Sequence, residues 1–196
     1  MIKAVIFDLG GVLLKGSIRK FIEKGEQILG VKAKSNSELD FDRKLNLGIS
    51  SERAAFERVF GKKMFDHEFI PLMKAWLSNW ALDGELLEYA KALGKRYKVA
   101  IMSNSAQSFV EKHEEEWGGI FSPIVYSHKV RMMKPGKEIF EYTLQKLGLK
   151  PEECVLVDDC RENGETCKQL GMHFVLYRNL NKLKKDLELY GVRASV

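Results

Sequence analysis

Several residue types that mark particular protein classes are scarce in this 196-residue chain, which has only three cysteines, four histidines and four prolines. An odd and small number of cysteines does not make a disulfide framework and favours a reducing compartment, so we expect a cytoplasmic protein. No apolar run approaches the roughly 18 residues of a membrane span, and the chain opens on a strand-like run without the layout of a signal peptide. These absences argue against a disulfide-rich secreted domain and against a membrane partner.

An excess of one charge is also missing. Lysine and arginine number 32 and aspartate and glutamate 27, which gives a net charge of +5 at pH 7. The charges are interspersed, as in residues 181–188, and such a pattern is typical of a solvated helix face, so we expect no nucleic-acid partner. A small positive bias is compatible with a small anionic substrate. The length is sufficient for one domain with a substantial core, with room for an inserted subdomain.

Short apolar runs alternate with segments of helical periodicity along most of the chain. The predicted strands are Ile2–Phe7, Lys98–Met102, Ile124–Tyr126, Val155–Val157 and His173–Tyr177. The predicted helices are Gly84–Leu93, Gln107–Glu116, Lys137–Leu147, Arg161–Leu170 and Asn181–Tyr190. This alternation predicts an α/β fold with a Rossmann-like, three-layer core, in which a parallel sheet carries helices on both faces.

Residues 15–84 have a different character, with helical runs and no clear strand. The predicted helices there are Ile18–Leu29, Leu39–Leu45, Ser51–Phe60 and His67–Trp80. We therefore expect a core domain made of residues 1–14 and 85–196, with residues 15–84 inserted as a helical cap subdomain. An insertion directly after the first strand would cover the edge of the sheet at which α/β proteins bind ligands.

Polar side chains follow three of the predicted strands. Asp8 ends the first apolar run and is followed by Gly10 and Gly11, which allow a tight turn close to a ligand. Ser103 follows the second strand, and the pair Asp158-Asp159 follows a later one. Because the carboxyl ends of parallel strands meet at one edge of the sheet, we expect these side chains to gather there.

Together with Lys134, which precedes a proline, these residues supply complementary chemistry. Asp8 offers a carboxylate nucleophile or metal ligand, Ser103 an anion-holding hydroxyl, and Lys134 a fixed positive charge. Several carboxylates held close together usually bind a hard divalent cation, because without a cation they raise each other's pKa values. A nucleophile, an anion holder, a cation and a metal together match phosphoryl transfer.

The same residues carry a resemblance to a known family. The segment from Phe7 to Val12, Ser103-Asn104, Lys134-Pro135, and Val157-Asp158-Asp159 with Asn163 resemble the four successive motifs of the haloacid dehalogenase superfamily. The helical insertion is similar to the cap that one large subgroup places between the first two motifs. Among subgroups, the chain resembles phosphatases of the glucose-1-phosphate type and the phosphatase domain of soluble epoxide hydrolases.

The resemblance implies a role for each matched residue. Asp8 would attack phosphorus and form an aspartyl-phosphate, and Mg²⁺ would be held by Asp8, the Gly10 carbonyl and Asp159. Ser103 and the Asn104 backbone would bind the transferring phosphoryl group, with Lys134 offsetting its charge. Asp158 would orient Lys134 or a metal-bound water without contacting the substrate. Asn163 would have a similar indirect role, and it stands where the superfamily often has a further acid. The implied function is Mg²⁺-dependent hydrolysis of a small phosphomonoester, possibly a sugar phosphate.

One position departs from the family pattern. Most phosphatases of this superfamily have a second aspartate two positions after the nucleophile, which acts as general acid and base, and Gly10 stands there in this chain. Loss of such a group costs about 10²–10⁴-fold in rate unless another group replaces it. His128, in a predicted loop before Lys134, is a candidate substitute, and Lys15 is either a phosphate contact or a solvated side chain.

The missing acid keeps two other hypotheses open. A haloacid dehalogenase also lacks that aspartate and forms an ester on its own aspartate, but it needs no metal and has no use for the Asp158-Asp159 pair. A catalytically silent protein that binds phosphate or a partner would also tolerate Gly10, although the nucleophile and the metal acids argue against it. The sequence names neither the substrate nor the oligomeric state.

Overall fold

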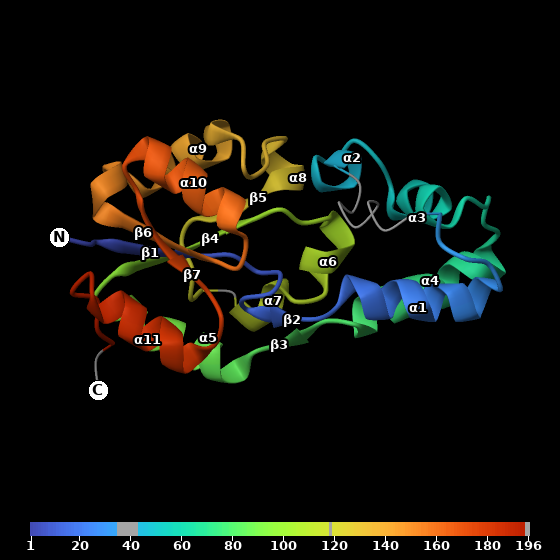
Figure 1. Cartoon of the computed structure of the whole chain (residues 1–196), viewed down its shortest axis with the longest axis horizontal. Coiled ribbons are helices and arrows are strands. Elements are labelled where there is room, and N and C mark those ends of the chain that lie inside the picture. Colours follow the sequence, from blue (N-terminus) through green and yellow to red (C-terminus); the bar gives the residue numbers. More distant parts are fainter. Residues whose placement is uncertain (35–42, 118, 195–196) are drawn as a thin grey trace.

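The structure is a computed structural model that describes residues 1–34, 43–117 and 119–194. Five parallel strands form the main sheet in the order β5-β4-β1-β6-β7 (Figure 1). Their bounds are β1 Ala4–Phe7, β4 Lys98–Ser103, β5 Ile124–Tyr126, β6 Cys154–Asp158 and β7 His173–Leu176. The strands predicted from the sequence are thus all present, with ends that differ by one or two residues.

Helices cover both faces of this sheet, as the alternating pattern predicts. Alternate side chains of β1 face opposite layers: Ala4 and Ile6 belong to a buried cluster with α9 and α10, whereas Val5 and Phe7 pack in the cluster that includes α5 and α11. The bounds are α5 Gly84–Gly94, α9 Lys137–Leu147, α10 Arg161–Leu170 and α11 Leu180–Glu188. The predicted Rossmann-like α/β fold with three layers is confirmed.

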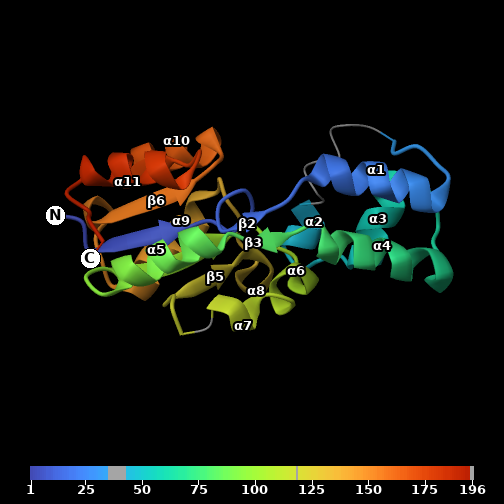
Figure 2. The same ribbon diagram turned by 90° about the horizontal axis from the view of Figure 1, so that it is seen from below.

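The helices between β1 and α5 lie beyond the carboxyl ends of the strands, while both chain termini lie at the opposite end (Figure 2). Their bounds are α1 Ile18–Leu29, α2 Arg43–Asn46, α3 Glu52–Phe60 and α4 Asp66–Ser78. Aromatic side chains hold α1, α3 and α4 together: the ring of Phe21 lies 5.1 Å from that of Phe56 and 5.0 Å from that of Trp76, between centroids. Most of the predicted helix Leu39–Leu45 lies outside the described residues.

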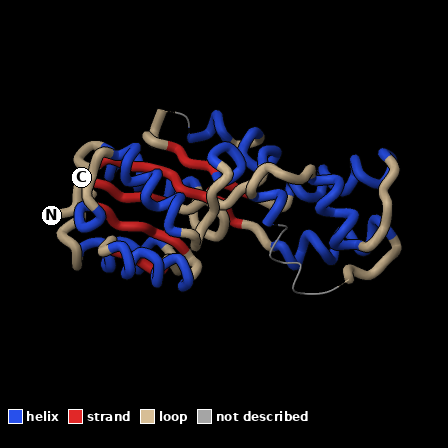
Figure 3. Tube along the Cα trace, turned by 90° about the horizontal axis from the view of Figure 1, so that it is seen from above, coloured by secondary structure: helices blue, strands red, loops and turns tan. Residues whose placement is uncertain are grey.

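Two short strands join this helical part to the sheet, which corrects the expectation of no strand within residues 15–84. β2 (Leu14–Lys15) pairs antiparallel with β3 (Ala81–Leu82), so that the chain leaves and re-enters the core side by side (Figure 3). Two residues are too few to establish an alternating pattern, because a strand is recognised by period-two alternation over four residues or more. This pairing therefore left no signal in the sequence.

Two further predictions about local structure are wrong. The predicted helix Gln107–Glu116 is two short helices, α6 (Gln107–Glu111) and α7 (Glu114–Trp117). The break falls at His113, which is buried and whose Nδ1 lies 2.7 Å from Glu116 Oε1 at the start of α7. The segment that contains His128, predicted as a loop, begins with a short helix, α8 (Ser127–Val130).

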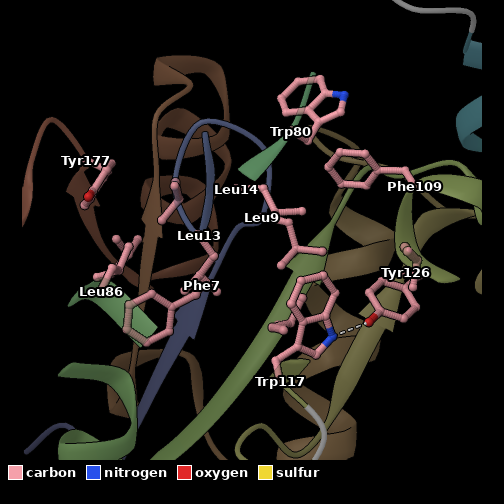
Figure 4. Close-up of a cluster of buried hydrophobic side chains, with 14 of the residues drawn as sticks. Phe7, Leu9, Leu13, Leu14, Trp80, Leu86, Phe109, Trp117, Tyr126 and Tyr177 are labelled. Carbon is pink, nitrogen blue, oxygen red and sulfur yellow. Dashed lines mark hydrogen bonds between the residues drawn. The ribbon is translucent and has the colours of Figure 1, made fainter. Parts of the chain in front are cut away.

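A continuous apolar core connects the sheet to the base of the helical part. Figure 4 shows buried side chains that run from Phe7 on β1 through Leu9 and Leu14 to Trp80, whose indole meets the ring of Phe109 edge-on at 5.0 Å between centroids. Among the described helices, none has the length and apolar character of a membrane span. The core thus fixes the position of the turn that follows β1.

Candidate active site

Asp8 directly follows β1, the central strand of the sheet, and its carboxylate is held from two sides. The backbone N–H of Leu9 donates to Asp8 Oδ1 at 2.7 Å, and Lys134 Nζ lies 3.0 Å from the same oxygen. The residue is only 9% exposed. Burial raises the pKa of the Asp8 carboxyl to about 7, with Asp158 adding to the shift and the Lys134 ammonium opposing it.

Lys134 reaches the cluster from the segment between α8 and α9, and the side chain of Asn104 fixes its backbone. Asn104 Nδ2 donates to the Lys134 carbonyl oxygen and Asn104 Oδ1 accepts from the Lys134 N–H, both at 2.8 Å. Lys134 is 2% exposed. Burial alone would lower its pKa, but the carboxylates of Asp8 and Asp158 raise it above the ordinary lysine value and so stabilise the charged ammonium.

Asp158 ends β6 and is completely buried among hydrogen-bond donors. Its Oδ2 accepts from Lys134 Nζ at 2.5 Å and from Asn163 Nδ2 at 2.8 Å, and its Oδ1 accepts from the Cys160 N–H at 2.8 Å. We call Asp8, Lys134 and Asp158 the carboxylate–lysine cluster. Its three members come from three segments of the core and satisfy one another in a buried environment.

Asp159 lies beside this cluster but is exposed. One carboxylate oxygen from each of Asp8, Asp158 and Asp159 lies within 4.8 Å of the others. Partial burial and the Asp158 carboxylate raise the pKa of Asp159, as the sequence predicts for acids gathered without a cation. Such a set of hard oxygen ligands suits a divalent cation such as Mg²⁺.

The two glycines of the turn after β1 differ in their surroundings. A Cβ atom built on Gly10 would meet no heavy atom of the described residues within 4 Å, and Gly10 does not adopt a positive φ. Gly11 has φ 74°, and a Cβ atom there would lie 2.1 Å from Asp159 Oδ2. Gly11 is therefore required for the approach of Asp159, whereas the space at position 10 is open.

A cavity of about 1050 Å³ lies over this edge of the sheet. Its lining includes six of the residues singled out from the sequence: Asp8, Gly10, Asn104, Lys134, Asp159 and Asn163. It also includes Trp76 and Trp80 from the helical part, together with Phe109 of α6. The cavity thus joins the carboxylate–lysine cluster to the segment that follows α4, and it is large enough for a ligand bigger than inorganic phosphate.

Four residues considered from the sequence lie outside the cavity lining, and one of them, Asp158, is described above. Ser103 ends β4, is 1% exposed, and its hydroxyl has no hydrogen-bond partner within the described parts of the chain. His128 is half-buried on α8, where its Nδ1 lies 2.7 Å from the Ser105 carbonyl oxygen, and burial lowers its pKa. Lys15 donates to the Tyr177 hydroxyl at 3.2 Å and lies 3.6 Å from Asp83 Oδ2, so it ties β2 to the core.

Sequence reasoning missed two features of this site. It assigned Asn104 to phosphate through its backbone and gave no signal for the side-chain clamp on Lys134, which joins residues 30 positions apart. It also gave no sign that Arg43 would line the cavity.

The fold and this cluster place the chain among α/β proteins with a ligand site at the carboxyl edge of a parallel sheet. The profile of the haloacid dehalogenase-like hydrolases matches residues 2–171, and the chain belongs to that family. It is therefore a hydrolase by family.

The chain is similar to several known proteins. It is 26% identical over 188 residues to a D-ribitol-5-phosphate phosphatase from Bacteroides thetaiotaomicron, covering 87% of this chain and 89% of the relative. It is 33% identical over 101 residues to a bifunctional riboflavin kinase/FMN phosphatase from Arabidopsis thaliana, and the match spans 48% of this chain and only 26% of that longer protein. Other curated relatives are also longer, with matches that span 36% and 21% of their lengths.

Among solved structures, a HAD family enzyme from Bacteroides thetaiotaomicron, in complex with magnesium and inorganic phosphate, matches with a TM-score of 0.77 and 22% identity, covering 93% of this chain and 99% of the other. At this level of identity the likeness establishes the fold.

Proposed function

We propose that this protein is a Mg²⁺-dependent phosphatase that hydrolyses a small phosphomonoester through an aspartyl-phosphate on Asp8. The observation that carries the proposal is the carboxylate–lysine cluster, which places a buried carboxylate and an ammonium group at one cavity. Relatives named as phosphatases act on small phosphorylated metabolites, D-ribitol 5-phosphate and FMN, and a metabolite of that size suits the cavity here. The three free cysteines are compatible with a reducing, cytoplasmic location.

The residues present fit the metal that the family uses. Asp8, Asp159 and the Gly10 carbonyl would hold Mg²⁺, and the close approach of Asp159 to Gly11 supports this assignment because any side chain at position 11 would displace the carboxylate. The cation would neutralise the acids and polarise the phosphoryl oxygens. Asp158 is already satisfied by three donors, so we assign it to holding Lys134 rather than to direct coordination.

The remaining roles follow from where each group lies. Asp8 is the nucleophile, since its second oxygen is not engaged by Lys134 or by the Leu9 N–H. Lys134 offsets the charge that repels an incoming dianionic phosphate. The Ser103 hydroxyl, which has no hydrogen-bond partner among the described residues, and the Asn104 backbone would bind the phosphoryl oxygens from the end of β4. Asn163 supports the charged form of Asp158 by donating a hydrogen bond to it.

The chain lacks a general acid at position 10, so only substrates with certain leaving groups should be hydrolysed rapidly. Leaving groups that depart without a proton, such as aryl or anomeric phosphates, lose the least from its absence. His128 remains a candidate substitute acid, although its ring lies behind the cavity wall against Ser105.

A haloacid dehalogenase is the second candidate, because it shares the nucleophile and needs no acid at position 10. The clustering of Asp158 and Asp159 with Asp8 favours the phosphatase, since a reaction at carbon without a metal has no use for three gathered carboxylates. A silent phosphate-binding protein is the third, and it would keep the cavity and the metal but not turnover.

The decisive experiment measures hydrolysis of para-nitrophenyl phosphate with Mg²⁺ and with EDTA, for the native protein and for Asp8→Asn. We expect metal-dependent release that falls by more than about 10³-fold in the variant, because the nucleophile is lost. The matched control is Asp186→Asn, which removes a carboxylate that pairs with Lys182 on α11, far from the cavity. No release from the native protein would reject the phosphatase, and a chloroacetate assay would then separate a dehalogenase from a silent binder.

A further inference from the structure

Arg131 has a left-handed backbone conformation that is unusual for an arginine. It ends α8 with φ 55° and ψ 32°, and it is the one non-glycine residue with positive φ among the described residues. Glycine is the usual residue at such a helix end, because it adopts this conformation without the steric cost of a Cβ atom. An arginine held there against local preference points to a use for its side chain, since strained positions cluster at functional sites.

Arg131 lines the same cavity as Asp8 and Lys134 of the carboxylate–lysine cluster, and so does Arg43. The two come from different parts of the molecule, Arg131 from the segment after α8 and Arg43 from the start of α2. These helices lie side by side (Figure 1), and the Ser127 hydroxyl donates to the Asn46 carbonyl oxygen at 2.5 Å across their contact. We call Arg43 and Arg131 the arginine wall.

Neither arginine of this wall is neutralised. Both are exposed, and across the described parts of the chain neither has an ion pair or a side-chain hydrogen bond. Lys134 is different, because two carboxylates already engage its ammonium. The arginine wall is therefore the positive charge that remains available to a ligand in the cavity.

Besides Asp8 and Asp159, two further carboxylates line the cavity, Glu138 and Glu162, but local structure accounts for them. Glu138 lies in the first turn of α9 and Glu162 in the first turn of α10, where a negative side chain stabilises the helix N-terminus. Their positions at the helix N-termini therefore account for both acids.

We propose that the arginine wall is a binding subsite for a second anionic group, so that the preferred substrate is a phosphomonoester whose leaving group carries a carboxylate or another phosphate. This inference rests on the proposed function for the position of the first phosphate. A guanidinium binds either group through two parallel hydrogen bonds, which a lysine cannot offer. Arg131 precedes Lys134 by three residues, so their Cα atoms lie at most about 10 Å apart, which suits a compact leaving group.

The test measures binding by calorimetry to the Asp8→Asn variant, which retains the cavity but should not turn substrate over. The probes are phenyl phosphate, para-carboxyphenyl phosphate and para-phenylene bisphosphate, with Mg²⁺ present throughout. We expect at least one doubly anionic probe to bind about 10–100-fold more tightly than phenyl phosphate, the range for a hydrogen-bonded charge. Whichever of the two is favoured identifies the second group as carboxylate or phosphate.

In the Asp8→Asn variant, the further substitution Arg131→Gly should reduce the ratio of the affinities for the doubly anionic probe and for phenyl phosphate towards one. This double variant is expected to fold, because glycine adopts φ 55° without strain. The matched control is Lys129→Gln, which removes one positive charge from α8 at a side chain that pairs with Glu114 outside the cavity, and which should keep the ratio. A ratio near one before any change to Arg131, or an equal loss in the control, would overturn the inference.

The two proposals fail separately. Hydrolysis of phenyl phosphate by the native protein combined with a ratio near one would reject the arginine wall and leave the phosphatase standing. Failure of all three probes to bind, together with no hydrolysis of phenyl phosphate by the native protein, would reject both, since the first phosphate would then have no site.

Discussion

The carboxylate–lysine cluster and the arginine wall face one cavity but are built in opposite ways. Asp8, Lys134 and Asp158 are buried and satisfy one another at 2.5 to 3.0 Å, and they come from segments anchored to the sheet. Arg43 and Arg131 are exposed and have no ion-pair partner in the residues described. The ion-paired side chains of the cluster hold their positions without a ligand. The exposed arginines would form ion pairs only when an anionic ligand binds.

This difference separates reaction chemistry from substrate choice. A buried cluster with satisfied hydrogen bonds holds its geometry without help, which suits groups that must meet a reacting atom. Exposed arginines are free to select among ligands, and they can change without disturbing the cluster. The open space at Gly10 belongs to the turn after Asp8 and also lines the cavity.

The largest effect is expected from filling that space. Gly10→Asp should raise the hydrolysis of alkyl phosphates by roughly 100-fold, because a general acid then protonates a leaving group that departs poorly alone. The gain for para-nitrophenyl phosphate should be much smaller. The measurement compares kcat/KM for the two substrates in the variant and the native protein.

Two other substitutions in the same turn serve as controls for Gly10→Asp. Gly10→Asn has nearly the same shape but cannot donate a carboxyl proton, so it should show no gain. Gly11→Ala would force a Cβ atom onto Asp159 at φ 74° and should weaken activation by Mg²⁺ instead. An equal gain on both substrates for Gly10→Asp would mean that the missing acid does not limit the rate.

The sequence alone predicted that the acidic residues at the carboxyl ends of the strands would lie close together. Asp8 directly follows the buried strand β1 and Asp158 ends β6, and the parallel pairing of these two strands brings both residues together. The clamp from Asn104 to Lys134 could not be predicted, because it joins two loops whose approach depends on the whole sheet. The positive φ of Arg131 was also invisible, since the residue type opposes it.

The second prediction concerns the free energy of unfolding, which the buried charge of Asp8 lowers. Asp8 has a pKa of about 7 in the folded chain and near 4 when unfolded, so the folded state binds the proton more tightly. Its contribution to stability is present below about pH 4 and is lost as the pH rises through 7. In EDTA, Asp8→Asn should therefore stabilise the fold at pH 8 by on the order of 2 kcal/mol, since loss of the Lys134 contact offsets part of the gain.

Thermal unfolding in EDTA at pH 8 and pH 5 measures this difference. The variant should unfold about 4–8 °C higher than the native protein at pH 8, and the gap should narrow at pH 5. The exposed-pair control Asp186→Asn should show neither change. A variant that melts lower than the native protein at pH 8 would mean that the ion pair with Lys134 outweighs the cost of burying the charge.

The smallest effect should come from the clamp that ties Lys134 to β4. Asn104→Ala removes both hydrogen bonds to the Lys134 backbone, and Asn104→Asp keeps the acceptor but loses the donor. Because the ammonium is still held by Asp8 and Asp158, we expect kcat to fall only about tenfold in the alanine variant and less in the aspartate variant. A loss comparable to that of Asp8→Asn would show that the clamp, and not the ion pairs, keeps the cluster in its reactive geometry.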